Sequence, residues 1–186
     1  RNARMYKVLP HKFLFDYDVS IWTDANLSLK KNPDSLVEKS LSEHNFATFD
    51  HRYNRDSMDC IYEEAENLLR LHSIGRHKDD PELIKKQVSG YKKEGYPKHN
   101  GLAVTQVLIR KHMEYDVIET MERWWNEIKN NSRRDQLSFN YAAWKTGLEF
   151  SYLPGDSRNN EWVDYLPHEK HSLKRRIKNY FKKFLG

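Results

Sequence analysis

The sequence predicts a mixed α/β domain. Short runs of β-branched and aromatic residues alternate along the chain with segments in which apolar residues recur at helical spacing, and this alternation is typical of a sheet flanked by helices. The length of 186 residues suits one domain, and the 13% of aromatic residues supply material for its core. Because no run of about 18 apolar residues occurs, no membrane-spanning helix is expected.

Strands are expected where such runs lie between polar stops. The first is the run from Val19 to Thr23, which reads as a buried strand and ends at Asp24. Further short strands are expected over 27–29, 46–49, 103–109 and 150–153.

Helices are expected where apolar residues keep a period of 3.6 and a capping residue precedes them. The pattern at 1–14 is interrupted by Pro10. Asp34 or Ser35 is a candidate N-cap for the helix that follows, Asp80 is one ahead of Pro81, and Ser132 is one further along. The later helices are expected over 34–41, 60–71, 81–93, 114–130 and 135–145, and in the tail from residue 173.

The charge is unevenly distributed. The chain carries 32 basic and 27 acidic residues, and residues 172–186 hold six of the basic ones and no acid. The rest of the chain is therefore nearly balanced, which argues against a basic nucleic-acid face over the whole domain. The single Cys60 excludes an internal disulfide and a cysteine-built zinc site, and it reads as a small buried hydrophobe.

The tail from 172 to 186 reads as a basic amphipathic helix. Its apolar residues recur at helical spacing between the basic ones: Leu173, Ile177, Tyr180, Phe181, Phe184 and Leu185. Such a helix suits an anionic membrane surface, or it packs on its own domain.

The first candidate for chemistry is Asp24-Ala25-Asn26, directly after the first strand. Ligands of α/β sheets bind at the carboxyl ends of strands, and Mg²⁺ and Mn²⁺ prefer oxygen ligands. Asp24 and Asn26 could therefore hold a divalent cation, or they form a turn in which the side chains bond their own backbone.

Other candidates lie near predicted helix ends. Asp135, beside Gln136, is either a capping acid or a group that accepts a proton from a hydroxyl. Arg4 and Lys7 share one helical face and could meet a phosphate, or they lie on a solvated face. For two further pairs the function competes with an ordinary structural role: Trp124 and Trp125 stack on a sugar or fill the core, and His168 with His171 bind a metal or lie on the surface.

In order along the chain, these pieces resemble a glycosyltransferase-like domain family found beside bacterial surface-polysaccharide genes and in plant proteins linked to pectin and mucilage. The resemblance covers about residues 1–171. It is carried by Ala3-Arg4, Lys7, Leu9-Pro10-His11-Lys12, Ser20 to Asn26, His51-Arg52, Cys60 to Ala65, Gln87, Tyr91, Glu94-Gly95, Asn100-Gly101-Leu102, Ile109 to His112, Trp124 to Glu127 and Ser132 to Phe139.

The resemblance implies a GT-A-like, Rossmann-like fold and a set of site residues. Asp24 and Asn26 would hold Mn²⁺ or Mg²⁺ against the donor diphosphate, with His168 or His171 as a late ligand. The remaining implied roles are donor binding by Arg4 and Lys7, catalysis by Asp135 and Gln136, and acceptor binding by Trp124, Trp125 and Arg134.

The implied function is metal-dependent transfer of a sugar from a nucleotide sugar, expected to be a UDP-sugar, to a glycan or lipid-linked acceptor in surface-polysaccharide synthesis. Asp135 would be the general base if the reaction inverts the sugar, and a positioning group if it retains it. The expected organisation is a domain over 1–171, partial at its N-terminus because the upstream nucleotide-binding segment is not seen, and the tail helix over 172–186. A cytoplasmic enzyme, peripheral on the inner face of the membrane, is the expected location.

Two departures keep alternative functions open. The family tends to carry an acid in the strand after the Asn-Gly turn, where this chain has Val104. The second departure is that the nucleotide-binding segment expected upstream of Arg4 is not seen. Both departures favour a non-catalytic relative that binds nucleotide or glycan. A metal-dependent hydrolase using the same carboxylate is a third function, and nucleic-acid binding through the tail is a distant fourth.

Overall fold

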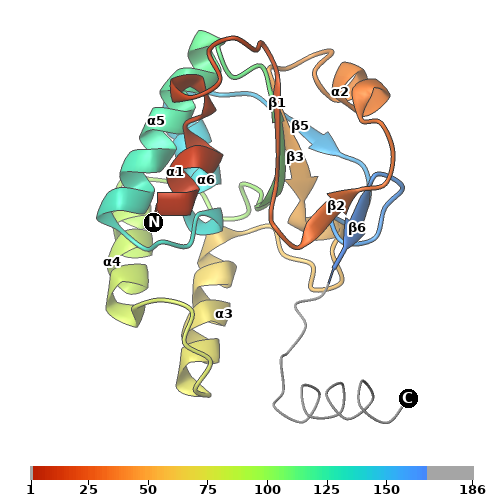
Figure 1. The fold of residues 1–186 in the computed structure, drawn as a ribbon. Coiled ribbons are helices and arrows are strands. Elements are labelled where there is room, and N and C mark those ends of the chain that lie inside the picture. Colours follow the sequence, from red (N-terminus) through yellow and green to blue (C-terminus); the bar gives the residue numbers. More distant parts are fainter. Residues whose placement is uncertain (1, 167–186) are drawn as a thin grey trace, which may run out of the picture.

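The fold is an α/β arrangement around a four-stranded mixed sheet, seen in a computed structural model that describes residues 2–166 (Figure 1). The strand order is β1 (Ser20–Thr23), β4 (Ala103–Arg110), β3 (Phe46–Asp50), β5 (Ser151–Leu153). β4 is antiparallel to β1 and to β3, and β5 is parallel to β3. The carboxyl ends of β1, β3 and β5 therefore meet at one edge of the sheet.

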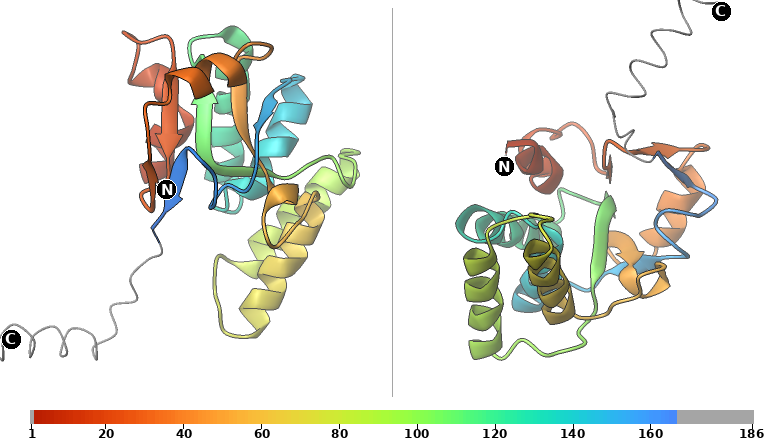
Figure 2. Two further views of the ribbon diagram at one scale, coloured as in Figure 1. Left: turned by 90° about the vertical axis from the view of Figure 1, so that its right-hand side faces the viewer. Right: turned by 90° about the horizontal axis from the view of Figure 1, so that it is seen from below.

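Helices and a small second sheet cover the two faces of the main sheet (Figures 1 and 2). On one side lie α1 (Asn2–Val8), α5 (Tyr115–Asn130) and α6 (Gln136–Thr146). On the other lie α2 (Asp34–Ser40) and the antiparallel pair β2 (Leu27–Leu29) with β6 (Val163–Tyr165). The helices α3 (Ile61–Ser73) and α4 (Pro81–Lys93) extend below the sheet, and two short 3₁₀ turns span Pro10–Lys12 and His51–Tyr53.

Each face of the sheet has its own apolar core because successive side chains of a strand point to opposite faces. On β4, Leu108 packs with the helical side, whereas Val107 and Ile109 pack with the side of α2. Both central strands are buried on both faces, which explains their continuous apolar character.

A bulge interrupts the pairing of β3 with β4. Thr48 pairs with Leu108, whereas the next residue, Phe49, pairs with Val104. The intervening residues of β4, Thr105, Gln106 and Val107, are therefore out of register with β3. Bulges often redirect side chains beside active sites, and Thr105 and Gln106 line the cleft described below.

The α/β prediction, a mixed sheet flanked by helices, is confirmed, and every predicted strand is present. The three-residue β6 was not predicted, because so short a run gives too little periodic signal to identify a strand. The predicted tail helix over 172–186 lies outside the described residues. Within 2–166, no helix is long and apolar enough to cross a membrane.

The predicted helix caps were right in one case and wrong in two. Asp80 caps α4, and its carboxylate accepts a hydrogen bond from the backbone N–H of Glu82. Pro33, rather than Asp34 or Ser35, is the N-cap of α2. Asp135, rather than Ser132, is the N-cap residue of α6, and its side chain makes no capping hydrogen bond. The buried Ser132 hydroxyl donates to Asp79 at 2.7 Å and accepts from the backbone N–H of Arg134 at 3.1 Å, ahead of the helix.

Candidate functional site

A polar cleft of about 350 Å³ opens where the carboxyl ends of β1, β3 and β5 meet. Each of these strands is followed by a residue that lines it: Asp24 after β1, His51 and Asn54 after β3, and Arg158 after β5. The start of α6 and the inner face of α1 close the opposite wall. This is the edge of an α/β sheet at which ligands usually bind.

Lys7 links the two acidic residues of the cleft. Its ammonium nitrogen lies 2.6 Å from Oδ2 of Asp135 and 3.3 Å from Oδ1 of Asp24. The side chain is only 5% exposed, so this is a buried ion pair formed between α1, the end of β1 and the start of α6. Asp24 also accepts a hydrogen bond of 2.9 Å from the Trp22 indole.

Asp135 is held in its ionised form. Burial raises the pKa of its carboxyl, but the Lys7 ammonium, with smaller contributions from Arg4 and Arg134, outweighs burial and lowers the pKa below the ordinary value. The Thr105 hydroxyl lies 3.3 Å from the same carboxylate oxygen. The carboxylate is therefore charged at neutral pH and fixed by contacts from several elements.

Two buried side chains behind the cleft hold this arrangement in place. The Trp124 indole donates a hydrogen bond of 2.9 Å to the backbone carbonyl of Asp135. The guanidinium of Arg110 donates one of 2.6 Å to the carbonyl of Lys7 and contacts Ser20. Burial lowers the pKa of Arg110 to about 9. Both residues act on the cleft through the backbone and do not line it.

The structure brings six of the predicted site residues together in one cleft: Arg4, Lys7, Asp24, Arg134, Asp135 and Gln136. Asn26 does not line it, and its backbone carbonyl accepts a hydrogen bond from Leu166. His168 and His171 lie outside the described residues.

The two tryptophans are placed differently from the prediction. Trp124 is fully buried in the core under the helices, so its ring presents no face on which a sugar could stack. Trp125 is partly buried, packs against the same core, and does not line the cleft. The helical pattern of α5 could not decide which of two adjacent large side chains faces inward.

Several cleft residues were not predicted from the sequence. Thr105, Gln106, Arg158 and Asn54 belong to no motif identified in the sequence, and His51 was named only as part of the family resemblance, with no role in a site. His51, Asn54 and Arg158 could have been found by the argument used for Asp24, because they too are polar residues that follow the carboxyl end of a strand.

Val104, which replaces the acid expected at this point of the strand, is 3% exposed and lines the cleft. The wall at this position is apolar.

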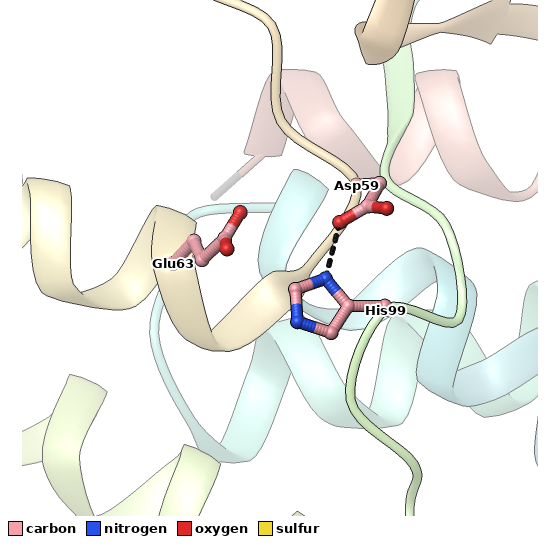
Figure 3. A group of neighbouring side chains, drawn as sticks. All are labelled: Asp59, Glu63 and His99. Carbon is pink, nitrogen blue, oxygen red and sulfur yellow. Dashed lines mark hydrogen bonds and ion pairs between the residues drawn. The ribbon is translucent and has the colours of Figure 1, made fainter.

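A second polar cluster lies apart from the cleft, at the start of α3 (Figure 3). The ligand atoms of Asp59, Glu63 and His99 lie within 4.8 Å of one another, and no other such group of three is found within residues 2–166. Nδ1 of His99 lies 2.6 Å from the Asp59 carboxylate, and this hydrogen bond raises the pKa of His99. The pair is solvent-exposed and ties the turn at residue 99 to the start of the helix.

The fold and the cleft define an α/β domain with a polar cleft, rich in cationic and amide side chains, at one edge of the sheet. Residues 1–153 match the model of the TOD1/MUCI70 glycosyltransferase-like domain, and the chain belongs to this family. The family predicted from the sequence is thereby confirmed. The chain is also 29% identical, over 147 residues, to a protein of Arabidopsis thaliana named probable hexosyltransferase MUCI70.

That match covers 75% of this chain and 24% of the Arabidopsis protein, so the chain spans about a quarter of that relative's length. No solved structure matches the chain. The family and the name of the Arabidopsis protein support a glycosyltransferase-like enzyme, without defining its donor, its acceptor or a metal.

Proposed function

We propose that this domain transfers a hexosyl group from a nucleotide sugar, with a UDP-sugar as the expected donor, to a glycan or lipid-linked acceptor. The observation that carries the proposal is the cleft itself. In a chain of a glycosyltransferase-like family, it gathers two cations of α1, the acid at the end of β1 and the acid at the start of α6. A GT-A-like arrangement of the sheet is part of the same proposal.

Sugar transfer requires that the acceptor hydroxyl lose its proton and that the negative charge on the leaving diphosphate be stabilised. The acceptor hydroxyl forms the new bond to the anomeric carbon while the bond from that carbon to the diphosphate oxygen breaks, and the hydroxyl proton passes to the departing diphosphate oxygen. Negative charge then builds on the diphosphate, and the cations Arg4 and Lys7 are placed to stabilise it. The rest of the rate enhancement would come from orienting the acceptor.

Asp135 suits a positioning role better than that of a general base. An effective base has a pKa near the working pH, whereas the pKa of this carboxyl is lowered and its oxygen is bound by Lys7. A fixed carboxylate can orient Lys7 and stabilise positive charge on the sugar. This supports the retaining form of the mechanism, with Gln136 beside it as a hydrogen-bonding group.

We also propose that Asp24 takes part in holding Mn²⁺ or Mg²⁺. Its side chain is 34% exposed, and one of its carboxylate oxygens accepts no hydrogen bond within the described residues, which suits a hard cation. The other proposed ligands are the histidines at 168 and 171, which lie outside the described residues, whereas Asn26 does not line the cleft and is left out of the set. When bound, such an ion supplies further neutralisation of the leaving diphosphate.

Calorimetry with nucleoside diphosphates and nucleotide sugars, with and without Mn²⁺, tests the donor site. We expect metal-dependent binding that Asp24→Ala weakens at least about tenfold, because a charged ligand is removed. Asp16→Ala, which removes an exposed acid of a loop, is the matched control and should leave binding unchanged.

The same proteins assayed for turnover separate the alternative functions. Nucleotide-sugar binding without transfer would identify a non-catalytic relative, for which the apolar Val104 wall is the supporting observation. Hydrolysis of glycan or lipid substrates without nucleotide-sugar binding would replace the proposal by a hydrolase.

We further propose that residues 172–186, outside the described residues, attach the enzyme to an anionic membrane surface. Six basic residues near such a surface contribute about 1 kcal/mol each. Deleting 172–186 should abolish co-sedimentation with phosphatidylserine vesicles at low salt. Unchanged co-sedimentation of the shortened protein would contradict the attachment.

A further inference from the structure

We propose that one wall of the cleft is a phosphate-binding cradle formed by His51, Asn54, Arg134 and Gln136, and that it holds the donor diphosphate through hydrogen bonds from the protein itself. The identity of the phosphate as the donor's rests on the proposed function. The cradle is distinct from Asp24 and the proposed metal ligands.

The first observation is a set of buried polar atoms that lack partners. Nδ2 of Asn54, Nε of Arg134, Nε2 of Gln136 and Nδ1 of His51 are all inaccessible to solvent and make no hydrogen bond within the described residues. Leaving such a group unpaired costs about 1–3 kcal/mol. Oε1 of Gln106, an acceptor, is a fifth such atom in the lining of the same cleft. This concentration of unpartnered polar atoms indicates that a ligand supplies the missing partners.

The second observation is that all four atoms of the cradle residues can donate hydrogen bonds. The orientation of the Asn54 amide is fixed, because its oxygen accepts from the backbone N–H and from the hydroxyl of Ser157, both at 3.1 Å. Its NH₂ group is therefore the free end. Arg134 can only donate. Burial lowers the pKa of His51, so its neutral ring can carry the proton on Nδ1. The missing partner must offer several acceptor oxygens.

The third observation is positive charge. His51, Arg134, Gln136 and Arg158 line both the cleft and an adjoining basic groove of about 780 Å³. The groove is further lined by Arg55, Arg70, Arg76 and Lys78. Since the chain outside its tail is nearly balanced in charge, this concentration of cations is local.

The acids of the groove do not saturate these cations. Arg134 lies 3.8 Å from Glu64, and Arg158 lies 3.9 Å from Asp56. Both distances exceed those of hydrogen bonds. Burial raises the pKa of Glu64, and Arg134 offsets this only in part. The guanidinium groups therefore retain donors for a ligand.

A phosphate or diphosphate fits these requirements best. It combines negative charge with several acceptor oxygens, and guanidinium groups match it geometrically. A neutral sugar would not neutralise the positive charge of the arginine side chains. A carboxylate of an acidic acceptor sugar shares part of the chemistry, so the experiment includes it as a separate arm.

The test is calorimetry of the 186-residue chain in EDTA with inorganic pyrophosphate, inorganic phosphate and glucuronate. We expect pyrophosphate to bind, and Asn54→Asp and Gln136→Glu each to weaken it at least about tenfold, because each replaces a donor by a negatively charged acceptor of the same shape. Asn54→Asp keeps the oxygen that Ser157 needs, and circular dichroism checks the fold. Asn126→Asp, on the exposed side of α5, makes the same change remotely and should have no effect.

The outcomes separate the cradle from the proposed function. Absence of pyrophosphate binding, binding by both cradle variants as tight as that of the unsubstituted protein, or binding of glucuronate alone would overturn the cradle. Pyrophosphate binding that depends on both residues, in a protein that transfers no sugar from any nucleotide donor, would support the cradle and reject the transferase. Sugar transfer that neither substitution affects would reject the cradle and leave the transferase standing.

Discussion

Lys7→Met should lower the free energy of unfolding at pH 7 by about 3–5 kcal/mol, because it removes the only buried ammonium that contacts both Asp24 and Asp135 in the described structure. Methionine preserves most of the apolar part of the lysine side chain, so the loss of stability measures the effect of removing the charge. The measurement is urea denaturation followed by tryptophan fluorescence. Lys85→Met, which breaks an exposed pair with Glu82, is the matched control and should cost under about 1 kcal/mol.

A double variant identifies the cause. Lys7→Met combined with Asp135→Asn removes both charges of the buried pair and should recover most of the loss. If the double variant is as unstable as the sum of its two parents, the ion pair is not the source of the effect.

We expect the loss of stability in Lys7→Met to depend on pH. In the native protein the pKa of Asp135 is lowered, so its contribution to stability is complete above its ordinary pKa and is lost as the pH falls through the lowered value. Without Lys7, burial alone would raise that pKa and stability would fall as the pH rises through it. The stability gap between native protein and Lys7→Met should therefore be small near pH 3 and large at pH 7. A gap of equal size at both would contradict this account.

Trp124→Ala should also cost about 3–5 kcal/mol, because this indole is fully buried in the core between the sheet, α5 and α6. The change also leaves the backbone carbonyl of Asp135 without the indole hydrogen bond. The neighbouring Trp125→Ala is the control, and its partly buried side chain should cost clearly less.

Trp124→Phe separates packing from the hydrogen bond. It keeps an aromatic side chain in the core and removes the donor to Asp135, so we expect a smaller loss of stability together with weaker nucleotide binding measured by calorimetry. Equal losses of stability for Trp124→Ala and Trp125→Ala would contradict the prediction that the fully buried Trp124 contributes more than the partly buried Trp125.

The candidate site was partly predictable because two of its features are local. Asp24 follows an apolar strand, and Asp135 begins a helix, so each could be named from its neighbours in sequence. Their partnership through Lys7 could not, because the three residues are separated by 17 and 128 positions and meet only when α1 packs beside the sheet. The core position of Trp124 was undecided for a similar reason, since α5 could turn either tryptophan inward.

By itself the sequence determined the α/β class, nearly every helix and strand, and the family, because hydrophobic period and strand or helix ends depend on residues close in the chain. The tertiary structure alone decided the strand order, the bulge that turns Thr105 and Gln106 to the cleft, and the gathering of His51, Asn54 and Arg158 at one edge. These features depend on contacts between distant segments. Several directions of packing satisfy the same local pattern, and the burial of the whole chain selects among them.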